Sequence, residues 1–139
     1  MSEQHMQRTV VQALKMFDAI AVENPKRPGT PDINYNHGWI ELKKAVSPKR
    51  YDSPVRVPHF TEQQRRWMLR RARAGGRVHL LLQLDRGWVL LGARFAAARL
   101  DRATKAEIIE NALCVWQSVG EGKTGLIKWL LSETQTVSS

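Results

Sequence analysis

Two acids and a lysine lie close together near the start of this sequence. Asp32 precedes Glu41 by nine positions, and Lys43 follows two positions later, all within the segment Gly-Thr-Pro-Asp-Ile-Asn-Tyr-Asn-His-Gly-Trp-Ile-Glu-Leu-Lys (residues 29–43). Carboxylate oxygens are the ligands that hard divalent cations prefer. A lysine beside them can orient an attacking water and help to deprotonate it. These residue types therefore predict metal-dependent hydrolysis, with Asp32 and Glu41 as metal ligands.

The chemistry requires a strand, a turn and a second strand. Side chains alternate between the two faces of a strand, so Glu41 and Lys43 point the same way while the apolar residues between them point into a core. A turn at residues 36–38 folds the first strand back and brings Asp32 close to them. Alternation also favours Lys43 over Lys44, which points to the opposite face.

Each of these residues has a plainer interpretation. Asp32 follows a proline, and an aspartate there is typical of an Asx-type turn. Glu41 is expensive to bury in its apolar strand without a metal or ion partner, but on the solvated face of an edge strand that cost disappears. Lys43 and Lys44 together could be a simple lysine run. The sequence leaves these alternatives open.

The set Pro31-Asp32 and Glu41-Leu42-Lys43 resembles the PD-(D/E)xK phosphodiesterase superfamily. Within it, the chain is most similar to the virus-type replication and repair nucleases and to the Holliday-junction resolvases, over about residues 3–92. The resemblance implies an α/β fold with a restriction-endonuclease-like α-β-β-β-α-β core, a mixed central sheet and a C-terminal helical extension. It also implies cleavage products with 5′-phosphate and 3′-hydroxyl ends.

The resemblance adds residues to the expected site. It implies the backbone carbonyl of Leu42 as a metal ligand, Gln64 as a catalytic residue on the following helix, and Glu3 as an acid that completes the metal shell. Gln64 fits a helix capping box equally well, and Gln63 is an alternative to it. Glu3 is more typical of a solvated first-turn acid, and Glu23 is a rival. The implied cofactor is Mg²⁺, one ion or two, for which Mn²⁺ can substitute.

The net charge of +9 is concentrated around this segment. Residues 26–77 hold 13 of the 22 Lys and Arg but 4 of the 13 Asp and Glu, and the rest of the chain is balanced. A surface of this kind attracts phosphate backbones. The plainer interpretation is a solubilising basic face or the binding of an acidic protein. The residues predicted to contact DNA are Lys26, Arg27, Lys49, Arg50, Arg65, Arg66 and Arg70.

The expected function is a metal-dependent DNA endonuclease, selective for junctions, flaps or branches, in DNA replication, recombination or repair. A phage origin is a further expectation. No base-reading module is evident, which favours recognition of DNA shape. The alternative is a non-catalytic nucleic-acid-binding protein on a nuclease scaffold, and a third reading is a packaging or assembly accessory protein. The intact set of Asp32, Glu41 and Lys43 favours the enzyme, because a mere binder has no physical reason to keep it.

Length and composition limit the domain organisation, the covalent cross-links and the location that can be expected. The 139 residues predict a single domain (1–139), with a core over about 3–92 and a helical C-terminal extension over about 100–131. The single cysteine, Cys114, excludes an internal disulfide and a cysteine-built zinc site. Without a leader or membrane-length apolar run, a cytoplasmic location is expected, in a bacterium or a host cell. Resolvase relatives act as dimers, so a homodimer is a further expectation, with Trp116, Trp129 and Leu130 either at its face or in ordinary core.

Hydrophobic periodicity and turn residues predict the elements around the motif. A first core strand is expected at 19–23 or as a very short segment. The other expected elements are a helix over 4–21, an exposed basic loop over 47–59, a helix from Thr61 to Gly75-Gly76, strands over 77–84 and 88–93, a helix from Asp101 to about 117, a short helix or strand over 126–131, and a frayed tail over 132–139.

Overall fold

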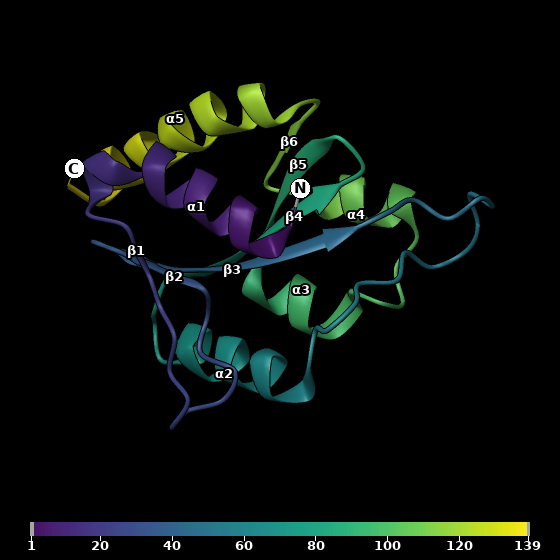
Figure 1. Ribbon diagram of the computed structural model, residues 1–139, viewed down its shortest axis with the longest axis horizontal. Helices are drawn as coiled ribbons and strands as arrows, with labels where there is room; N and C mark the ends of the chain where they lie inside the picture. The colour runs from purple at the N-terminus through teal and green to yellow at the C-terminus, as the bar shows by residue number, and fades with distance from the viewer. Residues whose placement is uncertain (1, 139) are drawn as a thin grey trace.

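The computed structural model describes residues 2–138, with side chains described through residue 133. Six strands form one mixed sheet in chain order, in which β3 and β4 are parallel and the other neighbours antiparallel (Figure 1). The strands are β1 (Ile20–Ala21), β2 (Ile33–Tyr35), β3 (Gly38–Ala45), β4 (Val78–Leu84), β5 (Gly87–Gly92) and β6 (Cys114–Trp116). The helices are α1 (Glu3–Ala13), the 3-10 turn η1 (Lys15–Phe17), α2 (Glu62–Arg73), α3 (Ala93–Arg99), α4 (Lys105–Asn111) and α5 (Val119–Ser138).

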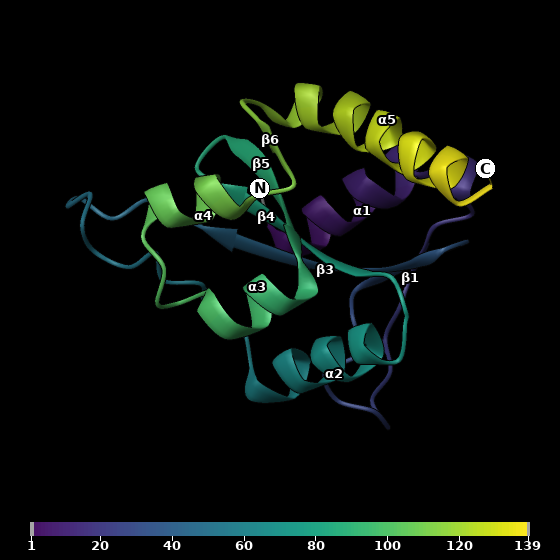
Figure 2. The same ribbon diagram turned by 180° about the vertical axis from the view of Figure 1, so that it is seen from behind.

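Helices cover both faces of the sheet. Helices α1 and α5 lie on one face, and α2 and α3 lie on the other, as the two opposite views show (Figures 1 and 2). Ile40 and Leu42 of β3 pack in the cluster with α1 and α5, whereas Ala45 packs with α2 and α3. The predicted alternation of β3 is therefore confirmed, and the residues at 39, 41, 43 and 45 face α2 and α3.

The order of the first elements is α1, β1, β2, β3, α2, β4. This order agrees with the α-β-β-β-α-β expectation, and the α/β class with a mixed sheet is confirmed. The more specific restriction-endonuclease-like core stays a prediction. The basic loop between β3 and α2 projects from the body of the protein (Figure 2).

The predicted N-terminal helix over 4–21 is too long. Helix α1 ends at Ala13, a 3-10 turn follows, and Asp18 takes a left-handed conformation with φ of 56°. Ile20 and Ala21 then form β1, which pairs with β2. Leu14 and Phe17 are nevertheless buried. Periodicity agrees with the burial of Leu14 and Phe17, but hydrogen bonds to β2 place Ile20 and Ala21 in a strand.

The predicted helix from Asp101 to 117 is wrong at both ends. Thr104 caps α4, because its side chain accepts a hydrogen bond from the backbone N–H of Glu107. Cys114–Trp116 form β6, which pairs with β5 and adds a strand to the sheet. The C-terminal extension is therefore not purely helical. Residues 126–131 belong to the long helix α5, which continues through Ser138 in place of a frayed tail; Ser139 lies outside the described residues.

Trp116, Trp129 and Leu130 pack in the cluster between the sheet and helices α1 and α5. This packing fits their interpretation as ordinary core, and dimerisation stays a prediction. Among residues 2–138, none of the helices is long and apolar enough to cross a bilayer.

Candidate active site

The β2–β3 hairpin holds Asp32 against β3. Ile33 pairs with Ile40, and one residue earlier the Oδ2 atom of Asp32 accepts a hydrogen bond of 2.9 Å from the backbone N–H of Leu42. The carboxylate of Asp32 thus continues the ladder one residue before β2 begins. Because this bond spans ten positions, the interpretation of Asp32 as a local Asx turn is wrong.

Hydrogen bonds to its backbone carbonyl also hold Asp32 in place. The carbonyl oxygen of Asp32 accepts hydrogen bonds from the backbone N–H of Val22, at 2.8 Å, and from Nε2 of Gln7 on α1, at 2.9 Å. Gly29, with φ of 92°, lies so close to the first turn of α2 that an added Cβ would approach the carbonyl oxygen of Gln63 to 2.5 Å. A side chain at position 29 would therefore push the loop that carries Asp32 away from α2.

Glu41 lies on an interior strand and is 1% exposed. Its interpretation as a solvated edge-strand residue is therefore wrong. Burial is the largest cause that raises the pKa of Glu41 well above its usual range; a hydrogen bond and the charge of Asp32 raise it further, and the charge of Lys43 opposes them. The Oε2 atom of Glu41 is buried without a hydrogen-bond partner among the described residues. The two acids thus share one site, in which Glu41 is buried and Asp32 is half-buried.

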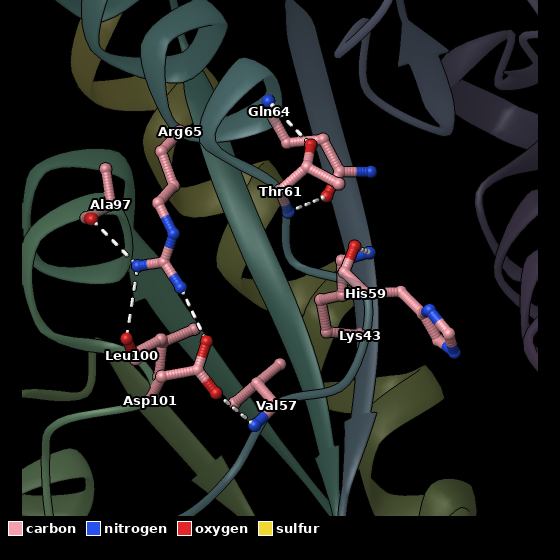
Figure 3. Close-up of polar contacts among 9 residues, drawn as sticks. All are labelled: Lys43, Val57, His59, Thr61, Gln64, Arg65, Ala97, Leu100 and Asp101. Carbon is pink, nitrogen blue, oxygen red and sulfur yellow. Dashed lines mark hydrogen bonds and ion pairs between the residues drawn. The ribbon is translucent and has the colours of Figure 1, made fainter.

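Lys43 lies on the same face of β3 and is 3% exposed. Its Nζ atom donates a hydrogen bond of 2.9 Å to the backbone carbonyl of His59, in the loop before α2 (Figure 3). The ring of Phe60 lies 5.9 Å from the same atom. The ammonium group is therefore held in one position close to Glu41, with N–H groups left for another acceptor.

Gln64 forms the capping box of α2 (Figure 3). Its Oε1 atom accepts from the backbone N–H of Thr61 at 2.9 Å, and its own backbone N–H donates to the hydroxyl of Thr61 at 3.1 Å. The capping interpretation is thus confirmed. The side-chain amide NH₂ remains as a donor, so a catalytic role for Gln64 stays a prediction.

The expected third acid is not assembled with this pair. Glu3 is exposed and lines a cavity of about 730 Å³ together with Lys44, whose side chain lies on the other face of β3 from Glu41. Glu23 is exposed in the segment that follows β1. In the part of the chain that is described, no three His, Cys, Asp or Glu residues gather into a metal-binding group. Among the described residues the arrangement is therefore a two-carboxylate group, and a role for Glu3 as a third metal ligand stays a prediction.

Arg65 is not available for DNA, contrary to the sequence prediction. Its Nη1 atom donates to the carbonyls of Ala97 and Leu100 at the end of α3, and its Nη2 atom donates to Asp101 at 2.6 Å (Figure 3). Asp101 in turn accepts from the backbone N–H of Val57, two residues before His59. Arg65 therefore ties α2 to α3 and, through Asp101, to the loop that holds Lys43.

We expect Arg65→Ala to lower the free energy of unfolding by about 2–3 kcal/mol, because it breaks a mostly buried ion pair and leaves Asp101 without its charged donor. Urea denaturation measures this. The matched control is Arg66→Ala on the next position of α2. Arg66 is exposed and, among the described residues, pairs with Glu62 alone, so its loss should change stability by less than about 0.5 kcal/mol. Equal effects of the two substitutions would contradict the structural role of Arg65.

The other predicted DNA-contacting residues lie on the surface. Lys26, Arg27, Lys49, Arg50, Arg66 and Arg70 are all exposed. Arg50 and Arg66 pair with neighbouring acids at exposed positions, and such pairs are weak enough to exchange for phosphate. These residues remain compatible with a phosphate-binding surface.

Sequence reasoning did not identify one aromatic residue and one basic residue near the site, Trp39 and Arg71. Trp39 shares the face of β3 with Glu41, and the guanidinium of Arg71 lies over its ring and over that of Trp67 on α2. Strand alternation gives Trp39 the same side as Glu41, so this signal was present. The position of Arg71 depends on how α2 crosses β3, which the sequence does not specify.

In comparisons with known proteins, no family model and no curated protein sequence matches this chain. Any assignment of function therefore rests on the arrangement of Asp32, Glu41 and Lys43 and on the charge around them.

Proposed function

We propose that the protein is a metal-dependent endonuclease that hydrolyses DNA phosphodiester bonds. The observation that carries this proposal is the carboxylate of Glu41, buried on an interior strand beside a second carboxylate and with one oxygen unpartnered among the described residues. Removing a carboxylate from water without compensation costs several kcal/mol. A divalent cation between Asp32 and Glu41 would supply that compensation, whereas a purely structural role would favour an uncharged residue here.

The donor set fits Mg²⁺ or Mn²⁺. Both are hard cations that bind carboxylate and carbonyl oxygens, and the only side chains that the pair offers are carboxylates. Asp32 and Glu41 would hold the ion, with the carbonyl of Leu42 as a third ligand in line with the family resemblance. When bound, the ion supplies Lewis acidity at the phosphate and a more acidic water.

The protein's own side chains would orient the attacking water and stabilise charge on the phosphate. The bond from Lys43 to the carbonyl of His59 holds its ammonium group beside the carboxylates, where it can orient a water and stabilise negative charge that develops on the phosphate. The free amide NH₂ of Gln64 is a further donor on the same side of β3. Because the Gly29 turn packs against α2, the loop that carries Asp32 keeps a fixed position relative to this helix.

The basic surface would bind the substrate. Lys26 and Arg27 precede the Asp32 loop, Arg66 and Arg70 lie on α2, and Lys49 and Arg50 lie on the projecting loop. Contacts to phosphate position DNA without reading its sequence. We therefore favour a substrate chosen by shape, such as a branched or frayed DNA.

The test is incubation of the purified protein with a flap, a four-way junction and a linear duplex, each in several unrelated sequences and with Mg²⁺, Mn²⁺ or EDTA. We expect cleavage with either metal, none in EDTA, and a higher rate on a branched substrate than on the duplex. Binding without cleavage under every metal would favour the non-catalytic alternative. Equal rates on all shapes, or cleavage confined to one sequence, would contradict shape selection.

DNA affinity should fall steeply with salt. If about six phosphates are contacted, affinity should drop roughly a thousandfold between about 50 and 200 mM salt. Replacing Arg66 and Arg70 with alanine should lower the salt slope by about one unit per lost contact. Fluorescence anisotropy measures it, and Arg86→Ala, in the turn between β4 and β5, is the control. A slope unchanged in the double variant would contradict our assignment of α2 to the DNA-binding surface.

A further inference from the structure

A second site lies at the end of the sheet where the β2–β3 hairpin turns. A cavity of about 360 Å³ opens there, bordered by the hairpin residues Asn36 and His37, by Trp39 of β3, by Arg71 in the last turn of α2, and by Arg77 just before β4. This volume falls in the range of small-ligand sites. The lining combines the aromatic side chains of Trp39 and Tyr35, amide and imidazole groups and two cations, with Asp18 as the one acid.

Arg71 is held in place by aromatic rings. Its guanidinium carbon lies 4.7 Å from the ring centre of Trp67 and 5.6 Å from that of Trp39, and the two rings meet edge to face at 5.1 Å. Its aliphatic stem crosses Gly76, where an added Cβ would approach the Cδ atom of Arg71 to 2.7 Å. The cation is therefore preorganised by its surroundings, and a ligand would not have to order it.

The charges of this cavity are available to a ligand. Among the described residues, neither Arg71 nor Arg77 forms an ion pair. The carbonyl of Arg77 accepts from the backbone N–H of Trp39 at 3.0 Å, which fixes the start of β4 against the hairpin. Arginines that form no ion pair, beside a half-buried tryptophan, are a combination that binds an unstacked base and its phosphate.

The cavity lies close to the acid pair. Trp39 precedes Glu41 by two residues on the same face of β3, which is about 7 Å along the strand. Arg71 follows Gln64 by two turns of α2, about 10 Å along the helix axis. An unstacked strand extends further than the 3.4 Å per nucleotide of duplex DNA, so adjacent nucleotides of one strand span this distance.

We propose that this cavity binds an unpaired nucleotide of a DNA strand, with its base against Trp39 and Arg71 and its phosphate near Arg77. The inference deepens the proposed nuclease function, since the neighbouring phosphodiester of the same strand then reaches Asp32 and Glu41. A base in an intact duplex is stacked on its neighbours and cannot enter. The site therefore selects flaps and splayed ends over a four-way junction whose arms are fully paired.

Binding of a short oligothymidine in EDTA tests the site without requiring catalysis. We expect the wild type to bind it more tightly than a duplex of the same length, and Trp39→Leu and Arg71→Gln each to weaken binding about 10- to 100-fold. Trp39→Phe keeps an aromatic face and should retain most of the affinity. Arg86→Gln, at the opposite end of β4 from Arg77, should bind as the wild type does.

Thermal unfolding separates a lost site from a lost fold, because Trp39 also packs on Trp67. If Trp39→Leu does not fold, Arg77→Gln and His37→Ala at the rim of the cavity decide the question, and each should weaken oligothymidine binding. Folded variants that all bind like the wild type would overturn the inference.

Cleavage assays keep this inference distinct from the nuclease proposal. If the cavity variants lose oligothymidine binding but no metal supports cleavage, the nucleotide site stands and the nuclease proposal fails. If the wild type cuts a flap and Arg71→Gln cuts it at the same rate, the nuclease proposal stands and the nucleotide site fails. Loss of the preference for a flap over a fully paired junction in Arg71→Gln would support both.

Discussion

Asp32→Asn and Glu41→Gln should each lower the rate of DNA cleavage by about 1000-fold or more, in line with the loss of a group that stabilises charge in a transition state. Asn keeps an oxygen to accept the hydrogen bond from the backbone N–H of Leu42, so the hairpin should remain intact. DNA affinity should change by less than about threefold, because it comes from arginines and lysines elsewhere. Single-turnover cleavage and anisotropy measure the two quantities.

A matched control is the comparison of substitutions at two adjacent lysines, Lys43 and Lys44. Lys43→Gln should remove cleavage as well, since Lys43 lies beside Glu41 with its ammonium held by His59. Lys44→Gln should leave cleavage close to the wild-type rate, because strand alternation puts Lys44 on the opposite face of β3, with Ile40 and Leu42. Undiminished cleavage by Glu41→Gln, or by the wild type in EDTA, would refute the metal-dependent mechanism.

The hairpin and its acids were predictable because they depend on local rules. Alternation along β3 placed Glu41 and Lys43 together, and the turn after β2 placed Asp32 against them. The capping role of Gln64 was also predictable from local sequence, because a capping box needs only Thr61 three residues earlier.

Contacts between distant segments could not be predicted in this way. The sequence around Arg65 offers only Glu62 as an acid, and it gave no sign that Asp101 would be its partner, 36 positions away. The same contact explains the misplaced helix start, because Asp101 binds Arg65 and Val57 instead of capping a helix. β1 and β6 are two and three residues long, too short for a periodic pattern, and pairing with a neighbouring strand defines them.

Glu41→Gln should also make the protein more stable in EDTA at neutral pH, by about 1–3 kcal/mol, because it replaces a buried and incompletely paired carboxyl group with a neutral amide of the same shape. The pKa of Glu41 is raised in the folded state, so folding favours its protonated form. Stability from this group is complete below its unfolded pKa and is lost as the pH rises through the folded value. The difference in unfolding free energy between variant and wild type should therefore grow with pH, by up to about 1.4 kcal/mol per pH unit.

Comparison of the wild type with Glu41→Gln separates the pH dependence due to Glu41 from the opposite pH dependence due to His79. Burial lowers the pKa of His79 to about 4, so His79 adds stability as the pH rises through the weakly acidic range, but it is present in both proteins and cancels in their difference. Urea denaturation from about pH 5 to 8 measures this difference, first in EDTA and then in Mg²⁺. Mg²⁺ should stabilise the wild type alone, by about 2.7 kcal/mol at 100 times its dissociation constant. If Glu41→Gln instead destabilises the protein in EDTA, Lys43 already compensates the carboxylate as a structural ion pair, and the reason for placing a metal there is gone.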